Sequence, residues 1–185
     1  SQLNVVIDVT DDLSNIPDFT TLNDRKYLCE LYYDTTLEWK GWALSDYVQM
    51  SYSTGRSNLA FNAIDGLGMI EHIPYALPTD YTLTDRNTCL GLLQTAISSV
   101  GFDLNLISGI SFFSTSMVDR GVDSANEPLI QSYINYASIT DDNQKAYNAL
   151  QVVTDIARGF GCRFFQAQGK WYIVPLTEFA QDSYY

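Results

Sequence analysis

The sequence predicts an α+β fold in which a mainly β half precedes a half with two helices and a C-terminal hairpin. Three observations predict it. Short segments in the first 64 residues alternate apolar and polar side chains, as half-buried strands do. Two later segments repeat apolar residues every three or four positions, as amphipathic helices do. Near the end of the chain, Gln168-Gly169 separates two apolar segments, which predicts a hairpin.

Four strands are expected in the first part of the chain. They cover residues 3–10, 26–34, 37–44 and 57–64. So few residues separate the second and third segments that the pair predicts a tight hairpin. One face of each outer strand is apolar: Leu3, Val5, Ile7 and Val9 in the first strand, and Leu59, Phe61 and Ala63 in the fourth.

A first helix is predicted from a cap at Thr84 or Asp85 to Gly101, which suits a left-handed residue after a helix. A second is predicted from Thr140-Asp141-Asp142 to Gly159 and Gly161, because carboxylates favour the positive end of a helix. The apolar faces comprise Cys89, Leu93, Ala96, Ile97 and Val100 in the first helix, and Ala149, Val152, Val153, Ile156 and Phe160 in the second.

The last predicted element is the hairpin, whose return strand closes at Pro175. Residues 102–139 are ambiguous: "LNLISGISFFST" could be a strand, and "LIQSYINYASI" fits either type of element. We expect a mainly β subdomain over residues 1–78 and an α+β subdomain over residues 79–185, which could also form one continuous fold.

The stretch "LAFNAIDGLGMIEHI", residues 59–73, raises the possibility of a phosphate-binding loop. The Asp-Gly-Leu-Gly pattern is too short for either nucleotide fingerprint, no lysine follows, and the acid would repel phosphate. We therefore expect a structural turn, in which Asp65 caps a short helix while Gly66 and Gly68 allow close packing. Gly169 is expected to serve the C-terminal turn. No cofactor is expected.

The composition sets further limits on function. The net charge of −12 argues against direct nucleic-acid binding, which depends on Lys and Arg. No apolar run is long enough to span a membrane. The chain has neither a starting Met nor a signal-peptide pattern, so we interpret it as a segment of a longer chain. Cys29, Cys89 and Cys162 are expected to be buried thiols outside any disulfide.

No catalytic or metal motif is complete. His72, the single histidine, lacks partners for a zinc site and is expected to be a partly buried residue after the short helix. Asp119, Asp123 and Glu127 could collect a cation, but their spacing does not match an EF-hand and favours a solvated loop. We predict no catalytic residue and no metal ligand.

Aromatic residues are the more unusual feature, since they make up 14% of the chain. Trp39 and Trp42 fall on opposite faces of one predicted strand, and Trp171 and Tyr172 on opposite faces of another. Exposed aromatic rings suit subunit interfaces or sugar stacking. We therefore name these four residues as candidate interface or ligand-stacking residues, with core packing as the alternative for any single one.

The order of several segments resembles that of tail-hub and baseplate proteins of tailed bacteriophages and related prophages. The segments are "KYLCELYYDTTLEWKGWAL", "AFNAIDGLGMIEHIPY" and "ALQVVTDIARGFGCRFFQAQGKWYIVP". The motif matches are a W-x-G strand at residues 39–42, an A-x-D-G-L junction at residues 63–67 and a Q-x-x-G-x-W-x-I hairpin at residues 166–173. The resemblance covers most of residues 25–176.

The resemblance implies a tail-tube-like antiparallel β-barrel or sandwich flanked by the helices. It also implies a non-enzymatic structural role in the virion tail, reached by assembly in the bacterial host cytoplasm. The implied partners are further copies of the chain, in a homo-oligomer such as a trimer, and other tail proteins. Two alternatives stay open: a carbohydrate- or receptor-binding module of a tail tip, and a tail-associated hydrolase.

Overall fold

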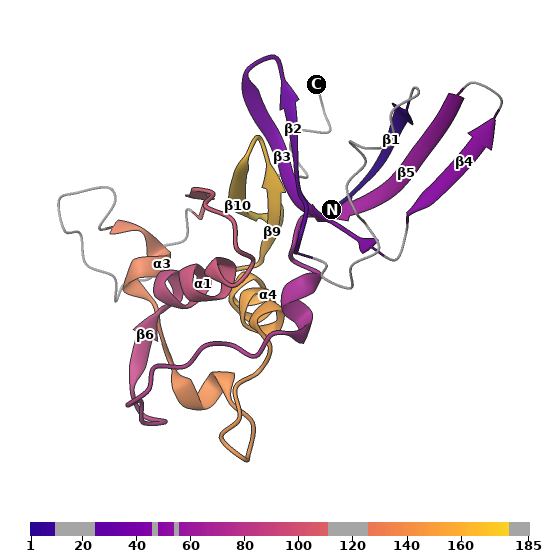
Figure 1. Ribbon diagram of the computed structural model, residues 1–185. Coiled ribbons are helices and arrows are strands. Elements are labelled where there is room, and N and C mark those ends of the chain that lie inside the picture. The colour runs from indigo at the N-terminus through magenta and orange to yellow at the C-terminus, as the bar shows by residue number, and fades with distance from the viewer. Residues whose placement is uncertain (10–24, 46–47, 54–55, 111–125, 178–185) are drawn as a thin grey trace. The chain divides into compact units, whose positions relative to one another are not determined.

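The computed structural model describes residues 1–9, 25–45, 48–53, 56–110 and 126–177 (Figure 1). Contacts divide the chain into two compact units. The first unit comprises residues 1–66 together with residues 166–169, and the second comprises residues 67–165 and 170–185.

The first unit is a five-stranded antiparallel sheet. Its strands are β1 (Gln2–Val9), β2 (Leu28–Tyr33), β3 (Thr36–Ala43), β4 (Gln49–Ser53) and β5 (Arg56–Ile64). The order is β1-β5-β3-β2, and β4 also pairs with β5. The antiparallel β architecture predicted from the sequence is confirmed, in the form of a curled half-barrel.

The curl has a simple origin in the strand register. β1 follows β5 over its whole length, from Gln2 opposite Ile64 to Val9 opposite Ser57. β3 meets β5 at only two pairs, Trp42 with Ile64 and Ala43 with Ala63. Beyond these two pairs β2 and β3 diverge from β1 and β5, as Figure 1 shows. The β2–β3 hairpin is therefore joined to β5 only at the end of the sheet where these two pairs lie.

The inner face of this sheet carries a small apolar core. Leu59, Phe61 and Ala63 alternate along β5 and are all buried, as their spacing predicts. Leu59 and Phe61 form a cluster with Ala43 of β3. Partly buried side chains complete this cluster: Val5, Tyr27, Cys29, Val48 and Met50.

Gly41 allows β3 to approach its neighbours closely. A Cβ atom at this position would lie 2.1 Å from the ring of Trp39 and 2.4 Å from the carbonyl oxygen of Ile64. Both distances are far below van der Waals contact. The glycine of the W-x-G motif is therefore needed so that Trp39 can fold against its own strand beside β5.

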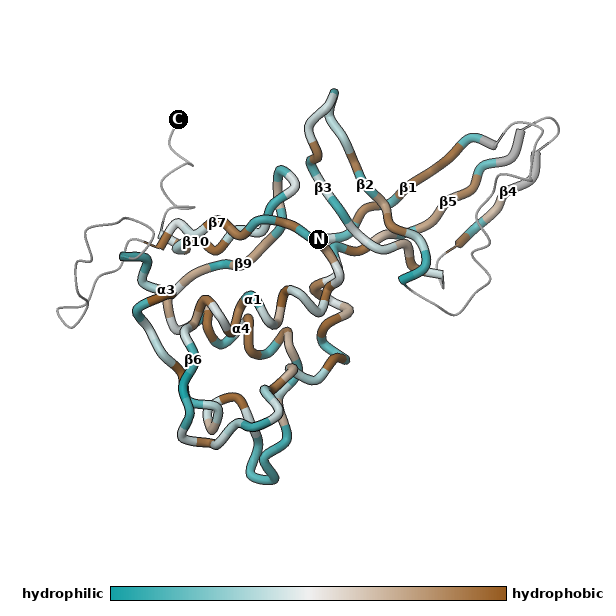
Figure 2. The backbone as a smooth tube through the Cα atoms, turned by 60° about the vertical axis from the view of Figure 1, so that its left-hand side comes forward, coloured by the Kyte–Doolittle hydropathy of each residue, from teal (hydrophilic) through white to brown (hydrophobic). Residues whose placement is uncertain are grey.

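The second unit is built around two helices, α1 (Cys89–Ser98) and α4 (Ala149–Gly159), which pack side by side. Figure 2 shows hydrophobic positions recurring along both helices. Short elements surround them: η3 (Met69–His72), β6 (Arg86–Thr88), β7 (Leu106–Ser108), α3 (Pro128–Gln131), β8 (Tyr133–Asn135) and η4 (Tyr136–Ile139). The C-terminal hairpin consists of β9 (Cys162–Ala167) and β10 (Lys170–Pro175).

Both predicted helices and the predicted hairpin are confirmed. The predicted apolar positions of the first helix are all buried: Cys89, Leu93, Ala96 and Ile97 in α1, and Val100 just beyond its end. In the hairpin turn, Gln168 and Gly169 both adopt a positive φ, 48° and 61°, which is the backbone that tight two-residue hairpins require. β7 adds to this hairpin as a parallel neighbour of β10.

The predicted starts of the two helices are wrong. The cap of α1 is Thr88, whose hydroxyl accepts from the N–H of Gly91 at 3.0 Å, and not Thr84 or Asp85. The intervening residues 86–88 form β6 and pair with β8. α4 begins after Asn148, whose side chain accepts from the N–H of Gln151 at 2.7 Å.

Asp141 explains why the second helix does not start at Thr140. Its carboxylate accepts from the backbone N–H groups of Asn143 and Lys145 at 2.9 and 2.8 Å. Thr140 pairs with Ala146 in a β-bridge across this turn. An acid that caps a helix can equally close a turn, because both arrangements offer it backbone donors.

The predicted thiols are confirmed as lying outside any disulfide, and Cys89 and Cys162 are buried, whereas Cys29 is half-buried. Burial raises the pKa of the Cys89 thiol to about 11 and raises the pKa of Cys29. Because the thiolate is the reactive form, both groups are protected at neutral pH.

A Gly41→Ala substitution should lower the free energy of unfolding by about 1–3 kcal/mol, since the added methyl group overlaps Trp39 and Ile64. The matched control is Gly159→Ala at the end of α4, where a Cβ would meet nothing within 4 Å. That control should leave stability unchanged or raise it by up to about 1 kcal/mol. Equal effects of the two substitutions in urea unfolding would contradict the close packing at Gly41.

Iodoacetamide at pH 8 should label Cys29 faster than Cys89 in the native protein, because Cys89 is more buried and its pKa is about 11. Mass spectrometry of tryptic peptides measures the two rates. Denaturant should abolish the difference. Rapid labelling of native Cys89 would show that this end of α1 is open to solvent.

Candidate functional site

Exposed apolar side chains gather on two strands of the first unit. Six of the nine exposed large hydrophobic residues in the described part of the chain belong to β1 or β2. They are Val6 and Ile7 on β1, and Leu28, Leu31, Tyr32 and Tyr33 on β2. Val6 is 61% exposed and Tyr33 is 74% exposed. We call these six residues the edge patch.

β1 and β2 are also the two ends of the strand order β1-β5-β3-β2. Among the strands that the structure describes, each pairs with a neighbour on one side only. The other side of each strand carries backbone N–H and C=O groups that can pair with a further strand. An apolar end strand is a ready site for association, whereas proteins that stay monomeric commonly protect such edges with lysine or proline.

The polar side chains of β2 are held by neighbours within the sheet. The Glu30 carboxylate accepts from Lys40 Nζ of β3 and from the Tyr32 hydroxyl, both at 2.8 Å. These hydrogen bonds lower the pKa of the Glu30 carboxyl, and the bond to Glu30 raises the pKa of the Tyr32 phenol. The cross-strand pair compensates the negative charge of Glu30, so β2 presents a mainly apolar surface.

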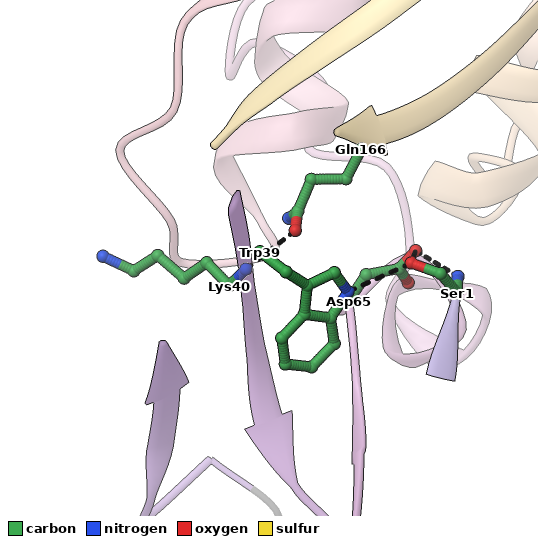
Figure 3. A network of polar contacts seen from close by, with 5 residues as sticks. All are labelled: Ser1, Trp39, Lys40, Asp65 and Gln166. Carbon is green, nitrogen blue, oxygen red and sulfur yellow. Dashed lines mark hydrogen bonds and ion pairs between the residues drawn. The ribbon is translucent and has the colours of Figure 1, made fainter. Parts of the chain in front are cut away.

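A polar network holds the end of the sheet where β1, β3 and β5 meet (Figure 3). Asp65 follows β5 directly, and it is buried, with 3% of its surface exposed. Its carboxylate accepts from the backbone nitrogen of Ser1 and, at 2.9 Å, from the Ser1 hydroxyl. The indole N–H of Trp39 donates to that same hydroxyl oxygen at 3.1 Å. The Asp65 carboxylate thereby links the end of β5 to the start of β1, and the Ser1 hydroxyl links β3 to the same point.

Residues 166–169, the tip of the C-terminal hairpin, belong to the first unit and contact β3 there. The Gln166 side-chain oxygen accepts from the backbone N–H of Lys40 at 2.8 Å, and Gly169 N–H donates to the Glu38 carbonyl at 3.1 Å. A Cβ on Gly169 would lie 2.7 Å from the Leu37 carbonyl oxygen. Glycine at position 169 is thus needed for the close approach to Leu37 as well as for the positive φ of the turn.

The four aromatic candidates separate into two classes. Trp39 and Trp171 are buried, and Trp171 stacks on Phe164 with ring centroids 5.5 Å apart. Trp42 and Tyr172 are half-buried, and Tyr172 stacks on Phe165 at 5.5 Å. Only the half-buried pair therefore retains surface for an interface or a ligand.

The residues of the Asp-Gly-Leu-Gly corner lie together, with roles that differ in detail from those expected. Gly66 adopts φ 83°, as a turn requires. The short helix η3 has Gly68 as its N-cap residue and no side-chain cap hydrogen bond, so Asp65 does not occupy that position. Asp65 instead accepts from Ser1. The corner therefore has a structural role, in which the Asp65 carboxylate binds Ser1 at the start of β1.

Of the remaining candidates, His72 and Glu127 lie in the part of the chain that the structure describes. His72 is exposed in the last turn of η3, and not partly buried after it as predicted. Asp119 and Asp123 lie outside the described residues, and Glu127 accepts from the Ser108 hydroxyl at 2.7 Å. Within the described ranges no three His, Cys, Asp or Glu side chains are grouped to hold a metal ion. No described helix is long and apolar enough to cross a membrane.

Sequence reasoning did not identify Ser1 or the edge patch, and it included Gln166 only as the first residue of the Q-x-x-G-x-W-x-I motif. For β1, a signal was available: Val6 and Ile7 are both apolar, although a strand with one polar face should alternate. No local signal predicts the contacts of Gln166 and Ser1, because their partners lie 126 and 64 residues away in the sequence.

Replacing Asp65 with alanine should lower the free energy of unfolding by about 1–3 kcal/mol, because the Ser1 donors then lose their buried acceptor. Asp155→Ala is the matched control, since that carboxylate is exposed on α4. It should change stability by no more than about 0.5 kcal/mol. Similar midpoints for both variants in urea unfolding would show that the Asp65 network contributes nothing measurable.

Comparison with known proteins gives a match at the level of the fold. No protein-family model matches the chain, and no curated protein sequence matches it. Several solved structures match, and two of them have a TM-score of 0.54 each. One is the 43 kDa tail protein of prophage MuSo2 from Shewanella oneidensis, at 9% identity over 94% of this chain. The other is a tail protein from Neisseria meningitidis MC58, at 13% identity over 93%.

The chain spans 46% and 41% of the length of these two structures. At such low identity the similarity establishes the fold and nothing finer. Nearly the whole of the chain is nevertheless covered, so both the half-barrel and the helical unit belong to the shared fold. The fold expected from the resemblance to phage tail proteins is thereby confirmed: this chain has the fold of part of a prophage tail protein.

Proposed function

We propose that the chain is a structural component of a phage-like tail hub or baseplate, which acts by assembly and without catalysis. The observation that carries this proposal is the edge patch, an apolar surface on the two end strands of the half-barrel. The fold shared with two prophage tail proteins supports the same role.

In the proposed assembly, the half-barrel of one copy pairs with that of the next through β1 and β2. Backbone groups at the two strand ends supply hydrogen bonds, and the edge patch supplies apolar area. Such head-to-tail contacts between unlike surfaces close into a ring when the rotation permits it. A homo-oligomer of this kind, such as a trimer, would dock to other tail proteins in the virion tail after assembly in the host cytoplasm.

The strong acidity of the chain is consistent with such a ring. With 22 acidic and 10 basic residues, its surface repels a phosphate backbone. We propose that acidic side chains line the passage so that DNA moves through without adhering. An assembled ring with its acidic side chains away from the lumen would overturn this part of the proposal.

A carbohydrate-binding module of a tail tip is the second candidate. Tyr32 and Tyr33 at the end of β2 favour it, because both rings are exposed and can stack on sugars. Two of the four rings first considered, Trp39 and Trp171, are buried and offer no such platform. Binding of the monomer to a glycan array, lost on Tyr33→Ala, would support this candidate over assembly.

The double substitution Val6→Lys and Leu31→Lys should abolish or strongly weaken self-association, because lysine charges oppose burial of the end strands. Sedimentation velocity over a range of concentrations measures the effect. Both side chains are exposed in the single chain, so the fold should be retained, as circular dichroism would check.

The control for this experiment is Tyr133→Lys, since Tyr133 is an exposed apolar residue on β8 of the second unit. It should leave the oligomer unchanged. A wild-type chain that stays monomeric at all concentrations, or an oligomer that survives the double substitution, would contradict assembly through these strands.

A further inference from the structure

β3 has an inner edge that the described strands leave largely uncovered. β1 pairs with one side of β5 over its whole length, so β3 and β4 both lie on its other side. β4 pairs with β5 from Ala60 to Arg56, whereas β3 pairs with it only at Ile64 and Ala63. β5 therefore has a strand partner along most of this side, but most of β3 has none among the described strands.

The backbone groups of Lys40 point to this inner edge. The Ala43 N–H donates to the Tyr27 carbonyl at 3.0 Å, so these two residues form a hydrogen-bonded pair. Such pairs alternate along an antiparallel ladder, which assigns Gly41 to the same class and Lys40, opposite Glu30, to the other. The N–H and C=O of Lys40 are thus directed away from β2. An uncovered edge of this kind can accept a strand of another chain.

Residues 166–169, which we call the hairpin tip, occupy this edge within the first unit. The Gln166 side-chain oxygen accepts from the Lys40 N–H at 2.8 Å. The Gly169 N–H donates to the Glu38 carbonyl at 3.1 Å. The hairpin tip therefore takes the place of a neighbouring strand beside β3.

Gln166 combines one satisfied and one unsatisfied polar atom in a buried position. Only 7% of its surface is exposed, and its side-chain Nε2 has no hydrogen-bond partner among the described residues. A buried donor without a partner destabilises the fold, so an apolar residue of similar size would be favoured if only packing mattered. The oxygen of the same side chain, however, satisfies the Lys40 N–H. This indicates that covering the edge of β3 is the main contribution of Gln166.

We propose that the hairpin tip protects the inner edge of β3 from pairing with a strand of another copy. With this edge closed, self-association is directed to the end strands β1 and β2, a consequence that rests on the proposed function. The protection itself does not depend on that function, because it consists of contacts within one chain. Covering an edge with a loop is a common way in which proteins prevent unwanted strand pairing.

Gly169→Ala tests the protection by forcing the hairpin tip away from β3, since the added methyl group would lie 2.7 Å from the Leu37 carbonyl oxygen. Gly161→Ala is the matched control. Gly161 and Gly169 have almost the same positive φ, 63° and 61°, but a Cβ on Gly161 would meet nothing within 4 Å. Both variants therefore carry the same backbone strain, and only Gly169→Ala displaces the tip.

The two variants are made in the chain that carries the two lysine substitutions in the edge patch, so that association through β1 and β2 is absent. Hydrogen–deuterium exchange of the Lys40 amide should become about tenfold faster in Gly169→Ala and stay unchanged in Gly161→Ala, because hydrogen bonding protects an amide. Sedimentation velocity should show a new concentration-dependent association for Gly169→Ala alone. As that association grows, the amides of residues 37–41 should regain protection, which would identify β3 as the contact.

Gln166→Leu is a second variant, which removes the acceptor of the Lys40 N–H without straining a glycine. It should change exchange and association in the same direction, so the protection can be tested even if Gly169→Ala does not fold. Gln151→Leu, at an exposed glutamine on α4, is its control and should change neither. Urea unfolding and the dispersion of the amide signals show which variants are folded.

Three results would overturn the proposal. The first is an unchanged exchange rate of the Lys40 amide in folded Gly169→Ala and Gln166→Leu. The second is faster exchange in a chain that stays monomeric at every concentration. The third is association with new protection outside β3. A wild-type chain that never associates would contradict the proposed function and leave these comparisons valid, so the two failures are distinguishable.

Discussion

The buried carboxylate of Asp65 is the constraint on which the first unit depends. β3 and β5 share only two register pairs, so their backbone hydrogen bonds alone give a short junction. Asp65 reinforces that junction by accepting from Ser1 at the start of β1, while Trp39 of β3 donates to the same serine. Gly41 makes this possible, because any side chain there would displace the Trp39 ring. Beyond this junction β2 and β3 diverge from β1 and β5, and β1 and β2 are the ends of the strand order.

An apolar surface follows from this arrangement. The edge patch lies on β1 and β2, and each of these strands pairs on one side only among the strands that the structure describes. Such strands suit the extension of a sheet by another copy, which is the basis of the proposed assembly.

Local patterns predicted most of the fold. Alternation in β5 and the three-to-four spacing in α1 identified the buried faces correctly, since burial on one face leaves a direct periodic signal. The helix starts were misjudged because Asp141 closes a turn with the same chemistry that caps a helix. β6, β7 and β8 have three residues each, which is too short for periodicity to show. The roles of Ser1 and Gln166 depend on partners distant in sequence, and local reasoning cannot supply them.

The claim that copies join through β1 and β2 can be measured directly by hydrogen–deuterium exchange at low and high protein concentration. If the account is right, amides of residues 2–9 and 28–33 become more protected as the oligomer forms, while those of β8 do not change. Exchange of β1 and β2 that stays the same in monomer and oligomer, with new protection elsewhere, would contradict it.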